Sequence, residues 1–344
     1  MIRKIAFVAL LVIYACGVSD EGEQKSDVQI LSEKIAENPE DIELLYERVE
    51  YNKLNNNLES ILYDLKGIIH LDSLDLKSHN QIAATYFELS KLPNTNSNYP
   101  SLVKHHLQKS LILNDKQASA HALMGELMMV YGAFNPENYK KAIESFNTSL
   151  KLDYNQERTH MLLGYTFKQL GKEEFAVNCF RNSINVNPDF YEAYVQLGQI
   201  FHFKKDTLAA VYYDNALRIN PTDELILYNK ALFYQDIEQW NKSLDAYAEL
   251  HKVDPFNSSG HYNLGFIHME LGLYDVAANN FSDAIYSNSE FYEAYYSRGN
   301  CFETLGNIAQ AESDYKRAIE INPEYTYAIE ALESLINMNK NYNK

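Results

Sequence analysis

Histidines are the residues best suited to chemistry in this sequence, because imidazole can bind a metal ion or carry a proton near neutral pH. The 344-residue chain contains ten, and four of them recur at intervals of 42, 39 and 101 residues: His79, His121, His160 and His261. A shared position in a recurring pattern indicates a packing or groove role copied by duplication. His105 and His106 are adjacent, and adjacent side chains on a helix point about 100° apart. We therefore expect no metal site.

The other reactive groups form no catalytic pattern. No pair of the three cysteines has zinc-ligand spacing. Nothing near Cys179 or Cys301 resembles an activated thiolate, so we expect both to be buried as small apolar side chains. The sequence also lacks the phosphate-binding loop, the dinucleotide fingerprint, the serine-hydrolase elbow and the metalloprotease motif. It therefore predicts a protein that is not an enzyme and needs no cofactor.

The charge balance excludes one class of partner and favours another. The chain carries 47 Asp and Glu against 30 Lys and Arg, for a net charge of −17. Nucleic-acid binding depends on clustered basic residues that displace counterions, so no nucleic-acid partner is expected. Most of the carboxylates are expected on the solvated faces of helices. Long-range attraction favours a partner that is neutral to basic.

One set of side chains suits binding rather than catalysis. Tyr228, Tyr262 and Tyr296 follow one another at intervals of 34 residues. Tyrosine offers rigid apolar area with a hydrogen-bonding tip, and amides can pair with the backbone of an extended peptide. The neighbouring positions of the same register hold amides and one serine: Gln196, Gln199, Asn229, Asn263, Ser297 and Asn300. The alternative is that the tyrosines only pack one repeat against the next.

The elements that position these residues follow from an internal repeat. Pro188, Pro221, Pro255 and Pro323 are separated by 33, 34 and 68 residues. In the unit 157–190, apolar and small residues at steps of three and four predict two helices. These residues are Leu163, Gly164 and Phe167 in the first helix, then Ala176, Phe180 and Ser183 in the second. Small residues let one helix receive the bulky side chains of the other.

This pattern resembles the tetratricopeptide repeat, a 34-residue helix–turn–helix unit. Four linked positions recur in seven units, and two of them are central to the packing. One is a small residue in the first helix, helix A: Ala83, Gly125, Gly164, Gly198, Ala231, Gly265 and Gly299. The other is a large residue, aromatic in six units, in the second helix, helix B: Leu107, Phe146, Phe180, Tyr213, Tyr247, Phe281 and Tyr315. The resemblance implies an all-α, right-handed α-solenoid of about eight repeats with a C-terminal cap helix, whose A helices line a concave groove.

The resemblance divides the chain into consecutive segments. Those before the regular repeats are a signal peptide (1–15), a lipidated tether (16–26), a leading half repeat (27–41) and a degenerate first repeat (42–75). The remaining repeats are 76–117, 118–156, 157–190, 191–223, 224–257, 258–291 and 292–325, followed by a cap helix and tail (326–344). Two repeats carry extra residues between their helices, in long turns at 92–100 and 131–139. Such insertions either mark a binding face or are tolerated loop growth.

The amino terminus predicts a membrane anchor. Arg3 and Lys4 precede an uncharged stretch that runs to Ala15, which is typical of a secretory signal peptide. Ile13-Tyr14-Ala15-Cys16 resembles the lipobox of bacterial lipoproteins, although Tyr14 departs from the usual small residue. The resemblance implies cleavage before Cys16 and attachment of acyl chains that hold the protein in a lipid bilayer. The alternative is an ordinary signal peptide in which Cys16 is incidental.

Together these features predict a non-catalytic scaffold or adaptor. We expect it in a bacterial cell envelope, lipid-anchored to the outer membrane and facing either the periplasm or the exterior. A peptide or protein segment would bind in its groove. Two alternatives remain open: a binder of glycan or peptidoglycan, and an accessory subunit of an envelope enzyme or secretion complex.

Overall fold

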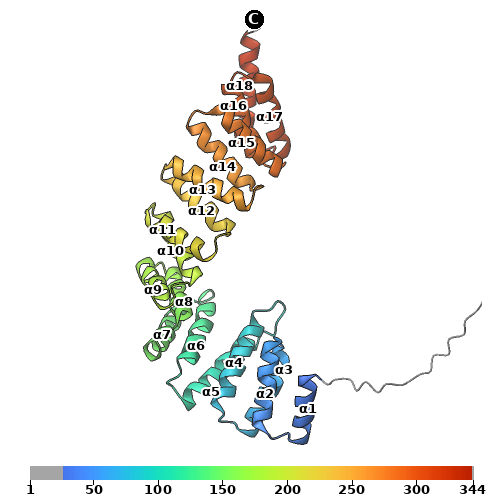
Figure 1. Ribbon diagram of the computed structural model, residues 1–344, viewed down its shortest axis with the longest axis vertical. Helices are drawn as coiled ribbons and strands as arrows, with labels where there is room; N and C mark the ends of the chain where they lie inside the picture. Colours follow the sequence, from blue (N-terminus) through green and yellow to red (C-terminus); the bar gives the residue numbers. More distant parts are fainter. Residues whose placement is uncertain (1–25, 343–344) are drawn as a thin grey trace, which may run out of the picture. The chain divides into compact units, whose positions relative to one another are not determined.

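The computed structural model describes the backbone of residues 26–342, and over these residues it contains eighteen α-helices and no strand (Figure 1). The chain forms two compact units that divide between Leu127 and Met128, inside helix α6 (Ala118–Gly132). We call the described residues before this point unit 1 and those after it unit 2. Each unit is all-α, as the sequence predicted.

Unit 1 is a stack of helices in which neighbours in sequence are neighbours in space. Its complete helices are α1 (Asp27–Glu37), α2 (Ile42–Leu54), α3 (Leu58–Leu71), α4 (Leu76–Ser90) and α5 (Tyr99–Leu113). In repeat terms, α2 and α4 are A helices, and α1, α3 and α5 are B helices. The stack therefore begins with a B helix that has no A helix before it among the described residues.

Unit 2 continues the same alternation, and each helix from α7 onward packs on the next (Figure 1). Its B helices are α7 (Glu137–Leu152), α9 (Glu173–Val186), α11 (Leu208–Ile219), α13 (Trp240–Val253), α15 (Tyr274–Ser287) and α17 (Ile308–Ile321). Its A helices are α8 (Glu157–Gln169), α10 (Tyr191–Phe203), α12 (Glu224–Asp236), α14 (Ser258–Glu270), α16 (Tyr292–Thr304) and α18 (Thr326–Tyr342).

Close packing within each pair explains the small residue of helix A. A Cβ atom added to Gly198 would lie 2.5 Å from the ring of Tyr213, and one added to Gly265 would lie 2.6 Å from the ring of Phe281. Both rings are completely buried. The missing side chain of glycine therefore leaves the space that the ring of helix B fills, as the sequence pattern predicted.

Local chemistry sets where the helices stop and start. Gly171, Gly272 and Gly306 adopt φ angles of 68°, 72° and 79° in the turns between A and B helices, a conformation that costs glycine little. At the A-helix starts, the Asp223 carboxylate accepts a hydrogen bond from the backbone N–H of Ile226 (3.0 Å). The Asn257 amide accepts one from Gly260 (2.9 Å) in the same way.

The two expected long turns differ from each other. The first connection is Lys91–Asn98, and Tyr99 and Pro100 already belong to α5. The second is shorter than the sequence indicated, because α6 continues through Gly132 and α7 begins at Glu137, which leaves 133–136. Most of the second insertion therefore lengthens helices instead of forming a protruding loop.

Candidate functional site

The predicted binding residues lie on four A helices of unit 2: α10, α12, α14 and α16. We call this set the A-helix row: Gln196, Gln199, Tyr228, Asn229, Tyr262, Asn263, Tyr296 and Asn300. All are half-buried except Asn263, which is only 9% exposed.

The tyrosines of the row pack against their own and the next repeat, not on one another. The Tyr228 ring meets the Tyr247 ring edge-on with centroids 6.0 Å apart. The Tyr262 ring lies 5.0 Å from the Phe291 ring, and the Tyr296 ring lies 5.4 Å from that of Tyr325. One side of each tyrosine therefore contributes to repeat packing, and the residue as a whole is half-buried.

Polar groups of the row connect successive repeats. The Asn263 amide donates to the hydroxyls of Tyr228 (3.0 Å) and Tyr247 (2.8 Å), so this predicted groove residue is occupied inside the protein. The Ser297 hydroxyl donates to that of Tyr262 at 3.4 Å. These contacts join α12 to α14 and α14 to α16.

The amides at the two ends of the row are also engaged. Lys168 donates to the Gln196 carbonyl oxygen at 2.8 Å, which joins α8 to α10. The Tyr315 hydroxyl donates to Asn300 at 2.7 Å. The side chain of Asn229 is different, because it makes no hydrogen bond with any residue that the structure describes. Asn229 is therefore the member of the row best able to pair with a ligand.

The sequence did not predict one polar contact between neighbouring A helices. His202 on α10 meets the Asp236 carboxylate on α12 at 2.9 Å, and its other ring nitrogen lies 3.2 Å from the Tyr213 hydroxyl. The signal that could have found the pair is the 34-residue interval between His202 and Asp236. With it, polar contacts link each A helix from α8 to α16 with the next.

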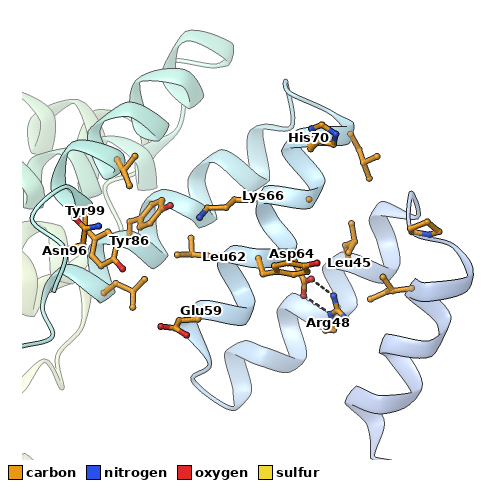
Figure 2. A pocket seen from close by; sticks show the side chains of 17 residues that line it. Leu45, Arg48, Glu59, Leu62, Asp64, Lys66, His70, Tyr86, Asn96 and Tyr99 are labelled. Atoms are coloured by element: carbon orange, nitrogen blue, oxygen red, sulfur yellow. Dashed lines mark hydrogen bonds and ion pairs between the residues drawn. The ribbon is translucent and has the colours of Figure 1, made fainter. Parts of the chain in front are cut away.

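Unit 1 contains a second candidate surface, an apolar pocket of about 930 Å³ over α3 (Figure 2). Asn96 and Tyr99, from the first predicted long turn, line it beside Tyr86. The insertion that the sequence singled out therefore contributes to a concave surface. Lys66 also lines the pocket, with its ammonium nitrogen 5.5 Å from the centre of the Tyr86 ring.

An ion pair with a buried carboxylate contributes to the lining of this pocket. Arg48 forms a two-pronged contact with Asp64, with distances of 2.9 and 2.6 Å, and donates a third hydrogen bond to Ser32 at 3.0 Å. Asp64 is only 1% exposed. The hydrogen bonds to Asp64 raise the pKa of the Arg48 guanidinium. Unit 2 repeats this arrangement with Ser282, Arg298 and Asp314.

The four recurrent histidines have one structural role. Nε2 of each lies 2.8 to 3.1 Å from the backbone carbonyl oxygen six residues earlier, in the turn that enters its helix. The Tyr194 hydroxyl makes the same contact with Pro188 at 3.0 Å. Histidine thus replaces the usual aromatic residue by closing the same turn. Among the described residues, no group of three or more His, Cys, Asp or Glu side chains could hold a metal ion.

Acid is expected to destabilise unit 1 through His106. Burial first, then the neighbouring His79, His105 and Lys66, lower the pKa of His106 from 6.5 to about 4. Between these values the unfolded chain binds the proton and the folded chain does not, so stability present above pH 6.5 is lost as the pH falls toward 4. The loss is at most about 3 kcal/mol, and solvent screening reduces it. Urea denaturation at pH 7 and pH 4.5 measures it.

The matched variants for this measurement are His106→Leu and His70→Gln. His106→Leu should flatten the pH dependence, whereas the same change of pH should act on His70→Gln as on the wild type, because His70 is exposed. An unchanged slope in His106→Leu would refute the assignment.

The thiols are unsuited to nucleophilic chemistry. Burial raises the pKa of Cys179 to about 12 and that of Cys301 to about 11. Neither ionises at neutral pH, so both act as the small apolar side chains that the sequence predicted.

Cys16 and residues 1–25 lie outside the described residues. Within the described part of the chain, no helix has the length and apolar character needed to cross a membrane.

Comparisons with known proteins identify the repeat. Two family models, both described as tetratricopeptide repeat, match one segment each: residues 157–190 and residues 292–325. The C-terminal part of a repeat-containing protein from Cytophaga hutchinsonii has a similar fold, with a TM-score of 0.52 at 14% identity. That match covers 83% of this chain and 99% of the other. It supports the all-α helix-pair architecture alone.

Two curated relatives share the repeats at low identity. Anaphase-promoting complex subunit 3 of Schizosaccharomyces pombe is 20% identical over 284 residues, which are 78% of this chain and 42% of that protein. BBSome complex member BBS4 of Bos taurus is 25% identical over 186 residues, which are 54% of this chain and 36% of that protein. The chain thus spans less than half the length of these relatives.

Proposed function

We propose that this chain, which contains tetratricopeptide repeats, is a non-catalytic scaffold that binds a peptide or protein segment along the A helices of unit 2. The observation that carries the proposal is the A-helix row. It presents half-buried tyrosine rings on three successive A helices, together with an amide at Asn229 that no described residue pairs. The accessible part of an aromatic ring supplies apolar contact area, and a free amide can pair with a peptide backbone.

The relatives support a role in assemblies. Two of them are named as subunits of multiprotein complexes, and repeats of this kind generally mediate contacts between proteins. The charge of the chain, −17, favours a partner that is neutral or basic. Tetratricopeptide proteins that hold an acidic peptide terminus do so with basic groove residues, which the row replaces with tyrosines and amides.

Disrupting the row should remove the partner. In-cell crosslinking and pull-down of Tyr228/Tyr262/Tyr296→Ala is expected to lose a protein that the wild type recovers. Because these rings also pack between repeats, Asn229→Arg provides a second variant that removes no internal hydrogen bond. The matched control is Tyr286→Ala, whose ring is 81% exposed and lies outside the row. Recovery of the same partners by wild type and both row variants would exclude the row as the binding site.

The second part of the proposal is lipid anchoring in a bacterial envelope. It rests on the resemblance of Ile13-Tyr14-Ala15-Cys16 to a lipobox. At least two acyl chains are needed for stable attachment, which is what acylation at Cys16 would supply.

Cys16→Ala tests the anchor independently of the row. The variant is expected in the soluble fraction of the envelope, whereas the wild type sediments with membranes and incorporates labelled fatty acid. Equal membrane association of the variant and the wild type would contradict the proposal. Tyr286→Ala again serves as the control, and it should be expressed and fractionate like the wild type.

A further inference from the structure

Unit 1 holds a second, polar pocket of about 460 Å³ among α1, α2 and α3, close to the turn between α2 and α3. Its lining is rich in amides and hydroxyls: Val28, Ser32, Arg48, Tyr51, Asn52, Asn55, Asn57, Ser60, Tyr63 and Asp64. All of these residues belong to unit 1. The pocket is therefore separate from the A-helix row.

Asn52 is the unusual residue in this lining. It is only 5% exposed, yet its side-chain amide makes no hydrogen bond with any described residue. The oxygen and nitrogen of this amide are not among the described side-chain atoms that are fully buried without a partner, so they are open to the solvent of the pocket. Because Asn52 lines the pocket, its free donors and acceptors are available to a molecule bound there.

The repeat register shows that packing alone does not require these amides. At the position of Asn52, five other repeats have an aromatic ring: Tyr86, Phe167, Phe201, Tyr234 and Phe302. At the position of Asn55, five have an aliphatic side chain: Leu89, Leu170, Ile237, Leu271 and Leu305. Asn52 is smaller than the ring found in those repeats, so it leaves space and adds polar groups to the wall of the pocket.

The last repeat provides an internal comparison. It contains the same Ser–Arg–Asp contacts, formed by Ser282, Arg298 and Asp314, but has Phe302 and Leu305 in place of Asn52 and Asn55. The ion pair is thus compatible with an apolar surrounding. Polar residues at positions where most other repeats have apolar packing residues, without a structural need for them, point to binding.

We propose that this pocket binds the acetamido group of a neutral saccharide. The Arg48 charge is neutralised by Asp64, so the pocket offers no net charge and favours an uncharged ligand. Asn52 can both donate to and accept from an amide, and Arg48 retains two N–H groups beyond the three already used. The Tyr63 ring, 75% exposed, provides a flat apolar surface for a sugar ring.

The size of the pocket fits this class of ligand. A volume of about 460 Å³ falls in the range of small-molecule sites, which combine apolar area with a few convergent polar groups. Half-buried Val28 supplies apolar contact for the methyl of the acetamido group. A peptide backbone amide shares the hydrogen-bonding part of this chemistry, but it has no ring of its own that could stack on Tyr63.

The test compares two trisaccharides that differ only at the acetamido position. Saturation-transfer NMR and calorimetry on the full chain are expected to show binding of N,N′,N″-triacetylchitotriose (here called chitotriose) and at least tenfold weaker binding of cellotriose. Asn52→Phe, which restores the ring found in other repeats, should abolish binding while the Tm equals or exceeds that of the wild type. Tyr63→Ala should weaken binding at least tenfold without lowering the Tm, and Tyr286→Ala should retain it.

Several results would overturn the proposal. These are an absence of chitotriose binding by the wild type, equal binding of cellotriose, or full affinity in a folded Asn52→Phe variant. Tighter binding of the peptide Ac-Ala-Ala-Ala-NH2 than of chitotriose would assign the pocket to peptides instead. Because the row variants of unit 2 leave this pocket intact, failure here is distinguishable from failure of the proposed scaffold function.

Discussion

Arg298→Ala is expected to destabilise the C-terminal repeats by about 3–5 kcal/mol, because it leaves a buried carboxylate without its counter-charge. Arg298 contacts Asp314 with two hydrogen bonds of 2.7 Å, and a third at 3.0 Å reaches Ser282 on the preceding B helix. Asp314 is 5% exposed. One guanidinium therefore joins three helices: α15, α16 and α17. Hydrogen exchange of the amides in α16 and α17, together with urea denaturation, measures the loss.

Two controls separate this effect from a general loss of charge. Removing both partners, as in Arg298→Met/Asp314→Leu, should restore stability to within about 1–2 kcal/mol of the wild type, since no buried charge is left unpaired. Arg317 on α17 contacts Glu290 and Glu320 at the protein surface. Arg317→Ala removes these surface contacts and should therefore have little effect on stability. Equal losses in Arg298→Ala and Arg317→Ala would contradict the assignment.

Gly265→Val is the second substitution with a large expected effect, a loss of about 3 kcal/mol from overpacking. A Cβ at this position would lie 2.6 Å from the ring of Phe281, which is completely buried and cannot withdraw. The two helices of the repeat would have to move apart. Thermal and urea denaturation of the full chain measure the loss.

A double-mutant cycle ties the effect to this contact. Phe281→Ala alone should cost about 3–5 kcal/mol by leaving a cavity. The double variant Gly265→Val/Phe281→Ala should cost less than the sum by about 1–3 kcal/mol, because the valine occupies part of the space. Gly67→Val is the matched control, since the nearest atom to a Cβ there is 3.8 Å away, on Leu45. Strict additivity of the two changes would refute the packing explanation.

Local and periodic features could be read from the sequence. The small residue of helix A and the large residue of helix B, usually aromatic, recur at intervals of about 34 residues, and the structure places both as the pattern predicted. Such features depend on contacts within one helix pair. The two helices of a pair are close in sequence, so spacing alone determines which residues face each other.

Contacts between repeats were harder to predict. The Asn263 amide was expected in the groove, whereas it joins Tyr228 to Tyr247, and the His202–Asp236 contact was missed. A repeat register fixes the helix face on which a residue lies. It does not fix the distance between polar groups of two different A helices, which depends on how the repeats stack. Asn229 and Asn263 share one register position, yet only Asn229 has a free amide.

The sequence by itself determined the all-α class, the repeat length, the small and aromatic packing positions, and the absence of recognisable catalytic motifs. Only the tertiary structure decided which polar side chains are already paired, that Asn96 and Tyr99 line a pocket, and that Asn52 borders a void with its amide unpaired. The physical reason is that secondary structure and pair packing follow from short-range periodicity. Hydrogen-bond satisfaction and cavities depend on the joint placement of side chains from at least three helices.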